Sequence, residues 1–315
     1  MNGIIEAPRT RRGRAPARLH GVLALDKGPA MTSFQAVREV RRLLDERRVG
    51  HAGTLDPTAT GLLPICVGRA TRLVDYFHQQ PKQYECVVRL GQRSTTLDTE
   101  GELSDGASAA AVDAAAVAAL LPRFLGDTQQ VPPMHSAVRV EGRHLYELAR
   151  AGEVIERKPR PVHISSIELR EFRPGPLAEV DLRVVCGKGT YMRVLAADLG
   201  EALGTGGLLA WLERSRYGAL KLSHSIGLDA LAGMDDPAAA LLPPEIAVDH
   251  LGRVDVGPQL AVQVQRGQAV WLPRPPVELS HQEIRVHGPH GDLVAIGRLE
   301  GGLFKPTKVL GTEPG

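Results

Sequence analysis

Residues 50–73, GHAGTLDPTATGLLPICVGRATRL, place a single aspartate, Asp56, among glycine, threonine and alanine residues. Pro57 disfavours the helical conformation for the residue before it, so Asp56 is expected to be extended, with its side chain projecting from the chain. Glycines allow sharp turns and let a ligand approach the backbone, and here they stand at Gly50, Gly53 and Gly61. The stretch therefore predicts a tight polar loop that presents one carboxylate, followed by a short buried strand over LPICV.

A projecting carboxylate in such a loop suits a nucleophile, a general base or a metal ligand. The metal ligand is the weakest of these three roles, because His51 is the only other candidate ligand nearby. A structural alternative also stands, in which Asp56 forms an Asx turn and only holds the loop. These residues by themselves leave the alternatives open.

Length and composition narrow the class of protein. A chain of 315 residues with 43% apolar residues is typical of one large domain plus a small one. The formal net charge is only +2, so an anionic partner must be met by a local patch rather than by bulk charge. The three cysteines are far apart and odd in number, which favours a reducing cytoplasm over a disulfide framework or a zinc ribbon. There is no apolar run of roughly 18 residues, so we expect no membrane span.

Helices and strands can be predicted along most of the chain. GVLALDK, YECVVRL and AEVDLRVVC have the patterns of strands. A capping box from Thr32 to Gln35 begins a helix whose outer face is cationic, and that face either contacts RNA or is simply solvated. ATRLVDYF, DGASAAAVDAAAVAALL, HLYELARAG and TYMRVLAADLGEAL are predicted helices, the last of them ending at Gly204.

The two ends of the chain differ from its middle. Residues 1–18 carry five arginines among proline, glycine and alanine, which indicates a disordered basic arm or a solubilising tail. Near residue 235 the composition shifts, and DDPAAALLPPEIAVDH is typical of a linker. The short apolar runs that follow, LAVQVQ, EIRVHG, DLVAIGRL and PTKVL, are separated by glycine and proline and predict a small β-barrel.

The string GHAGTLDPTATGLLPICVGRATR resembles the aspartate motif of the TruB family of tRNA pseudouridine synthases. GVLALDKGPAMTS, KQYECVVRLGQRSTTLDTEG, VPPMHSAVRVEGRHLYELARAG, CGKGTYMRVLAADLG and LERSRYG are similar to further family segments in the same order. The resemblance spans roughly residues 20–310. The chain departs from the family pattern at Gly28-Pro29-Ala30, where Pro-x-Gly is usual, at His135, where tyrosine is typical, and at Arg139, where lysine is usual.

The resemblance implies an α+β pseudouridine synthase fold, with a central mixed, largely antiparallel sheet flanked by helices. It also implies a small C-terminal β-barrel of the RNA-binding PUA type. The expected organisation is a disordered basic arm over residues 1–18 and a catalytic domain over residues 19–245. A thumb insertion near residues 127–162 and a PUA-like domain over residues 246–315 complete it.

The implied reaction is the isomerisation of uridine-55 in the T loop of tRNA to pseudouridine, with no cofactor and no metal. The base is flipped out of its stack, the C–N glycosidic bond is cleaved with the help of Asp56, and a C–C bond to the same sugar forms. Whether Asp56 attacks the sugar C1′ or the ring C6 stays open. The family also implies substrate-binding roles for five residues. His51 is expected to fill the space that the base leaves, Tyr84 to stack on the flipped base and Tyr191 to form a pocket wall. Arg193 is expected to pair with Asp56, and Leu212 to border the uracil.

The expected partner is tRNA, bound through its T stem-loop, with no membrane and no obligatory protein partner. The chain is therefore expected to act as a monomer in the cytoplasm. Candidate RNA contacts are the cationic helix, the C-terminal barrel and the thumb, whose basic residues are Arg139, Arg143, His144, Arg150, Arg157, Lys158 and Arg160. Three alternatives remain: a guide-dependent synthase that needs partner proteins, a tRNA-folding chaperone, and an N-glycosidase that releases uracil.

Overall fold

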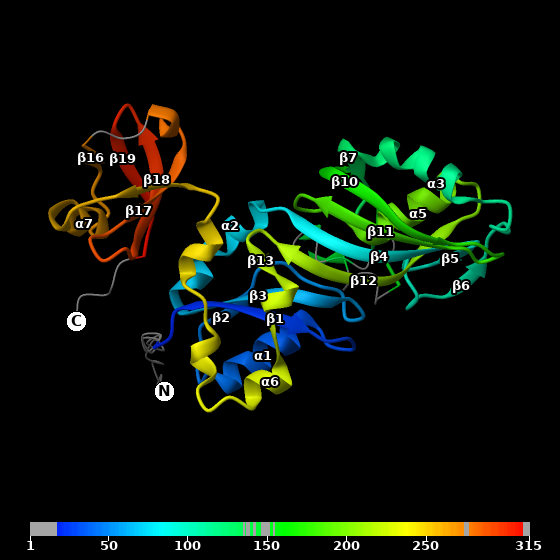
Figure 1. Cartoon of the computed structure of the whole chain (residues 1–315), viewed down its shortest axis with the longest axis horizontal. Coiled ribbons are helices and arrows are strands. Elements are labelled where there is room, and N and C mark those ends of the chain that lie inside the picture. Colours follow the sequence, from blue (N-terminus) through cyan, green and yellow to red (C-terminus); the bar gives the residue numbers. More distant parts are fainter. Residues whose placement is uncertain are drawn as a thin grey trace, which may run out of the picture.

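A computed structural model describes residues 18–134, 136, 139–140, 143–145, 152–153, 155–273 and 277–310 of the chain. Two large sheets organise these residues, one of ten strands and one of five strands near the C-terminus (Figure 1). Two small hairpins accompany them, formed by β5 (Gln92–Ser94) with β6 (Leu103–Asp105) and by β8 (Arg139–Val140) with β9 (Arg143–His144).

The ten-stranded sheet has the order β14-β1-β3-β12-β4-β11-β10-β7, with β2 paired to β3 and β13 paired to β12. Only the β1–β14 and β3–β12 pairs are parallel, so the predicted mixed, largely antiparallel sheet is confirmed. The strands are β1 (Gly21–Lys27), β2 (Val49–His51), β3 (Thr60–Val67), β4 (Lys82–Leu90), β7 (Gly126–Gln130), β10 (Arg160–Arg173), β11 (Glu179–Cys186), β12 (Gly207–Tyr217), β13 (Leu220–Lys221) and β14 (Ile226–Gly227).

The sheet consists of two halves that meet at a short seam. β12 pairs with β4 along almost its whole length, from Gly207 to Tyr217. Its pairing with β3 is much shorter, because the parallel register includes only Glu213 with Thr60 and Arg214 with Gly61. The half that contains β1, β2 and β3 is therefore joined to the rest of the sheet over a small part of β12.

Helices cover one face of the sheet and form its main core. They are α1 (Ser33–Leu43), α3 (Ala114–Leu120), α5 (Met192–Ala202) and α6 (Leu228–Ala232), and their apolar side chains pack with those of β1, β3, β4 and β11. The predicted capping box of α1 is confirmed, because the Thr32 hydroxyl accepts from the Gln35 amide and the Gln35 side chain accepts from the Thr32 amide. On the opposite face, η1 (Gly68–Leu73) and α2 (Val74–Gln79) pack in a second core with Leu62 and Cys66.

Two predicted elements were wrong. The alanine-rich segment was expected to be one long helix, yet α3 begins only at Ala114, because the Asp113 side chain caps it by accepting from the Ala116 amide at 2.7 Å. The residues before it form a loop and a turn, where the Ala109 amide donates to the Pro176 carbonyl and the Val112 amide donates to the Ala109 carbonyl, both at 3.0 Å. LAVQVQ, expected to be a strand, lies in α7 (Pro258–Gln265), which begins with the proline favoured at a first helical position.

Other predictions are confirmed only in part, or concern segments that include residues outside the described part of the chain. ATRLVDYF forms η1 and α2 rather than one helix. In HLYELARAG, residues 146–151 are among those that the structure does not describe, as is His135. The remaining short helical turns are η2 (Leu121–Phe124), η3 (Leu222–His224), η4 (Pro237–Ala240), η5 (Pro244–Val248) and η6 (Val277–Leu279).

The C-terminal sheet is curled, as in a half-barrel, and has its own core with α7. Its order is β15 (Gly252–Asp255), β17 (Glu283–His287), β18 (Leu293–Glu300), β19 (Leu303–Val309) and β16 (Val270–Trp271). It lies beside α2 at one end of the molecule (Figure 1), where the Tyr76 hydroxyl donates to Glu283 at 2.6 Å and Lys308 pairs with Asp75 at 3.2 Å. The segment before it also packs on the larger sheet, since Leu242 and Val22 exchange two backbone hydrogen bonds.

Candidate active site

The Asp56 loop closes the hairpin formed by β2 and β3, and three contacts fix it. The Ser33 hydroxyl at the start of α1 accepts from the Leu55 amide at 2.9 Å and donates to the Leu55 carbonyl at 3.1 Å. Lys27, at the end of β1, donates to the Pro57 carbonyl at 3.1 Å. Because both neighbours of Asp56 are anchored by buried groups, its carboxylate is held in place while its side chain remains 37% exposed.

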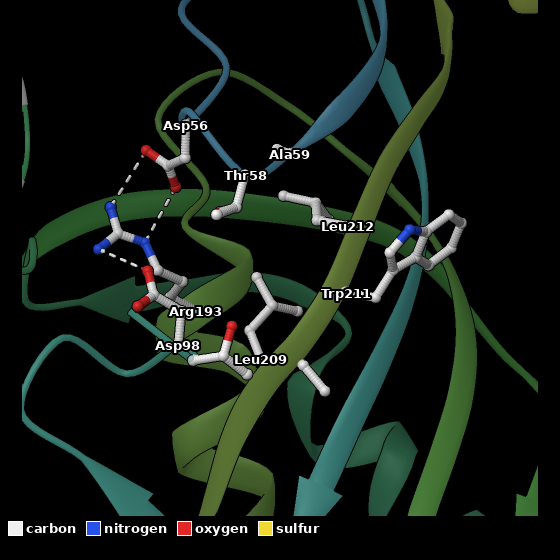
Figure 2. Close-up of a pocket in the computed structure, with 10 residues that line it drawn as sticks. Asp56, Thr58, Ala59, Asp98, Arg193, Leu209, Trp211 and Leu212 are labelled. Atoms are coloured by element: carbon white, nitrogen blue, oxygen red, sulfur yellow. Dashed lines mark hydrogen bonds and ion pairs between the residues drawn. The ribbon is translucent and has the colours of Figure 1, made fainter. Parts of the chain in front are cut away.

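Asp56 and Arg193 form the central ion pair of the site (Figure 2). The Nε of Arg193 lies 3.0 Å from Oδ2 of Asp56, and Nη2 donates to Oδ1 at 3.3 Å. Such a fork of two charge-assisted bonds fixes both the distance and the plane of a carboxylate. Arg193 lies in the first turn of α5, and its side chain is only 6% exposed. The structure thus brings together two residues that are 137 positions apart in the sequence.

Sequence reasoning did not single out Asp98, which lies on the other side of Arg193. Its Oδ2 is 3.5 Å from Nη1 of Arg193, and the same nitrogen donates to the Thr96 carbonyl at 3.1 Å. Asp98 is itself held by the Thr96 hydroxyl and by the Glu100 amide. The one signal in the sequence was the acidic run LDTEG after a predicted strand, in a segment quoted only for its tyrosine.

The electrostatic balance at Asp56 has several contributors. Burial raises the pKa of Asp56 above its ordinary value, and the nearby Asp98 carboxylate raises it further. Arg193, and more weakly Lys27, lower the same pKa because a positive charge favours the ionised form. The arginine therefore keeps an ionised, oriented carboxylate in a site that is otherwise unfavourable for it.

A pocket lies directly beside this ion pair, and its walls differ in polarity. The polar wall contains Asp56, Thr58, Asp98 and Arg193, while Ala59, Leu209, Ala210 and Leu212 contribute apolar surface. In Figure 2, Leu212 points from β12 towards Thr58 and Asp56, whereas Trp211 points to the other side of the strand. A charged group facing a flat apolar wall suits a ligand with one polar reacting end and one planar apolar face.

The other predicted site residues, His51, Tyr84 and Tyr191, are not among the described residues that line the pocket. His51 ends β2, and burial, followed by the charge of Arg214, lowers its pKa. Tyr84 lies half-buried on β4 opposite Arg214, and burial raises its pKa. Tyr191 precedes α5, where its backbone exchanges two hydrogen bonds with the Gln130 side chain, at 2.9 and 3.3 Å.

Two further observations concern classes of site. Among the described residues, no group of three or more histidine, cysteine, aspartate or glutamate side chains is arranged to hold a metal ion. None of the helices in that part of the chain is both long enough and apolar enough to cross a bilayer.

Comparison with known proteins shows extensive similarity. The sequence profile of "TruB family pseudouridylate synthase (N terminal domain)" matches residues 41–192. The tRNA pseudouridine synthase B of Symbiobacterium thermophilum is 45% identical over 258 residues, which cover 82% of this chain and 85% of that protein. The protein of the same name from Ralstonia nicotianae is 40% identical over 312 residues, which cover 96% of this chain and 98% of that protein.

Solved structures show the same fold. The chain in "Crystal Structure of a Cbf5-Nop10-Gar1 Complex" matches with a TM-score of 0.71 and 26% identity, covering 92% of this chain and 85% of that chain. A second match, in an H/ACA RNP bound to a substrate RNA, has a TM-score of 0.69 at 23% identity and covers 93% of this chain and 85% of that one. The predicted fold class is thus confirmed, and with relatives of this similarity over almost its whole length, the chain belongs to the TruB family of pseudouridylate synthases.

Proposed function

We propose that this protein is a tRNA pseudouridine synthase that isomerises uridine-55 in the T loop of tRNA to pseudouridine. The main support from the structure is the ion pair of Asp56 with Arg193 beside a pocket that has one polar and one apolar wall. The relatives that match 82% and 96% of the chain are named tRNA pseudouridine synthase B, which supports tRNA as the substrate.

In the proposed reaction, the uridine is flipped out of the T loop and its sugar comes to lie beside Asp56. The ionised carboxylate attacks or stabilises the reacting centre, the C1′–N1 bond breaks, and the base turns before C5 bonds to C1′. A proton leaves C5 and another is taken up at N1, so the product has the same atoms as the substrate. Holding the base in the pocket keeps water from the sugar, which would otherwise turn the reaction into hydrolysis.

The roles proposed for the other residues follow from their positions. Arg193 keeps Asp56 ionised and oriented, and Leu212 supplies the apolar wall against the uracil. Tyr84 stacks on the flipped base, and Tyr191 forms a further wall. His51 fills the space that the base leaves in the RNA; its lowered pKa favours the neutral imidazole, which can replace a base without adding charge.

The proposal extends to the organisation of the chain and its partners. We assign a basic arm to residues 1–18, the catalytic domain with its thumb to residues 19–245 and an RNA-binding PUA-like domain to residues 246–315. The protein would act alone as a monomer in the cytoplasm, in contrast to the structural relative that was solved as a complex of Cbf5 with Nop10 and Gar1.

The test is incubation of the purified protein with unmodified tRNA transcribed with tritium at C5 of uridine. Tritium release and mapping of the product are expected to show one pseudouridine in the T loop, without any added protein or cofactor. Asp56→Asn should abolish release and leave tRNA affinity within a few-fold of the wild type. A matched Asp249→Asn variant, changed at an exposed carboxylate on the C-terminal side, should stay active.

Each alternative function predicts a different outcome. Accumulation of free uracil would identify an N-glycosidase. Activity that appears only after a guide RNA and partner proteins are added would identify a guide-dependent enzyme. Rescue of tRNA folding in cells by the Asp56→Asn variant would show that RNA folding is the main function.

A further inference from the structure

A buried arginine lies two positions beyond the pocket residue Leu212 on β12. Arg214 follows Leu212 by two positions on β12, so its side chain lies on the same face of the strand. It is 1% exposed, and its Nε donates to the Leu62 carbonyl on β3 at 2.7 Å. Its Nη2 donates to the Gly53 carbonyl, in the loop that presents Asp56, at 3.2 Å. Arg214 thus reaches across the seam between the two halves of the sheet.

The positive charge of Arg214 has no carboxylate partner in the described part of the chain, where its guanidinium donates to two backbone carbonyls and also interacts with the Tyr84 side chain. Two other buried cations share its surroundings and also donate to carbonyls. Lys82 donates to the His78 carbonyl at 2.9 Å, and Lys27 donates to those of Gly28, Met31 and Pro57. Both Lys82 and Arg214 lie over the Tyr217 ring, with the Lys82 nitrogen 4.7 Å and the Arg214 guanidinium carbon 5.0 Å from the ring centre.

A buried guanidinium without a carboxylate partner is by itself unfavourable for the stability of the fold. Removing a cation from water without a neutralising partner costs free energy, and an apolar side chain of similar size fills buried space at lower cost. A buried positive charge that is retained next to a reaction site therefore calls for a function. The residues around Arg214 indicate which one: Leu212 precedes it on the strand, Tyr84 is its register partner on β4, and its charge acts on His51.

The proposed reaction contains a step that such a charge would assist. When the C1′–N1 bond breaks, its electron pair stays on the uracil, which is then anionic. The negative charge persists until its electron pair forms the bond from C5 to C1′; a proton then leaves C5 and another is taken up at N1. A positive charge fixed in advance at low dielectric stabilises such an anion without having to reorganise.

We propose that Arg214 is a positioning residue of the synthase: from its place beside Leu212 and Tyr84, its charge stabilises the detached uracil anion while its hydrogen bonds hold the Asp56 loop to β12. Arg214 does not need to touch the base, since its charge acts at a distance and its hydrogen bonds act through the Asp56 loop. This inference rests on the proposed function.

The test compares three substitutions that separate charge from hydrogen bonding. Arg214→Lys keeps the charge and a donor, Arg214→Gln keeps only a donor, and Arg214→Met keeps neither. We expect single-turnover pseudouridine formation to remain within about tenfold of wild type for Arg214→Lys and to fall by about 100-fold or more for the other two. The affinity for a T stem-loop should change by no more than a few-fold in all three, because the effect is on the chemical step.

Arg216→Gln is the matched control, because Arg216 lies two positions further along β12, is exposed and donates to the Gly218 carbonyl. It should leave the rate unchanged. Melting temperatures of all variants identify any that do not fold; if Arg214→Met fails to fold, the comparison of Arg214→Lys with Arg214→Gln still decides.

A glutamine variant as active as the lysine variant would overturn the proposal, since hydrogen bonding would then be the whole role of Arg214. Full activity of Arg214→Met would overturn it as well. These outcomes differ from a failure of the proposed function, in which the wild-type protein itself forms no pseudouridine.

Discussion

Asp56 and Asp98 face the same guanidinium, that of Arg193, at distances of 3.0 and 3.5 Å. One of these carboxylates is 37% exposed and borders the pocket, while the other is 12% exposed and held by its own turn. Arg193 and Asp98 affect the pKa of Asp56 in opposite directions, since Arg193 lowers it and Asp98 raises it.

The acidic limb of the pH–rate profile should therefore move in opposite directions in two variants. Because Asp56 acts when ionised, Arg193→Met raises its pKa and should shift the limb to higher pH. Asp98→Asn removes a negative charge, lowers the pKa of Asp56 and should shift the limb to lower pH. Single-turnover rates measured across the acidic range report both shifts, and two shifts of the same sign would show that Asp56 is not the titrating group.

His51→Ala should impair extrusion of the target base more than docking of the RNA. The imidazole is proposed to occupy the space that the flipped base leaves, so its loss removes a compensation for unstacking. A fluorescent base analogue beside the target uridine should brighten less with the variant than with wild type, while the dissociation constant changes only a few-fold. His224→Ala, altered at an exposed histidine, is the control; equal losses in binding and brightening would contradict the role.

Ala30→Gly should stabilise the protein. Ala30 has a φ of +58°, a left-handed conformation, at the position where the family usually has glycine. This conformation costs a non-glycine residue roughly 1–2 kcal/mol, and the greater freedom of glycine in the unfolded chain offsets part of the gain. We expect a net increase of about 0.5–1 kcal/mol in the free energy of unfolding in urea. Ala110→Gly, at an exposed alanine without positive φ, should instead be neutral or destabilising.

Gly53→Ala should weaken both stability and turnover. Gly53 has a φ of +93°, and an added Cβ would lie 3.2 Å from the Tyr217 hydroxyl oxygen. Strain of about 1–2 kcal/mol is expected from the backbone alone, and relief of that strain would displace the Asp56 loop. Gly50→Ala is the control, because a Cβ there meets no atom within 4 Å. Urea unfolding and single-turnover rates measured together would show whether the two losses coincide.

The sequence allowed prediction of the parts that depend on neighbours along the chain. The capping box at Thr32, the alternation in β4 and β11 and the end of α5 before Gly204 are all local patterns, and they are found as expected. Propensity misled at the alanine-rich segment, where a capping aspartate and a long-range backbone bond to Pro176 decide the start of α3.

Contacts between distant residues were beyond such reasoning. The place of Asp98 depends on an ion pair across 95 positions, and that of Arg214 on a hydrogen bond across 161 positions. Neither residue belongs to a periodic pattern, and the burial of a lone arginine contradicts the usual exposure of that residue type. The resemblance to a family pointed to Asp56 and Arg193, but the positions of the charged residues Asp98 and Arg214 could be found only from the structure.

The short parallel pairing of β3 with β12 has a mechanical consequence. Asp56 belongs to one half of the sheet, and Arg193 and Asp98 belong to the other, so the ion pair of the site spans the narrowest junction in the domain. A slight rocking of the halves about this seam would separate the carboxylate from its guanidinium. Bound RNA that grips both sides would act as a clamp, making alignment of the reacting groups a result of substrate engagement.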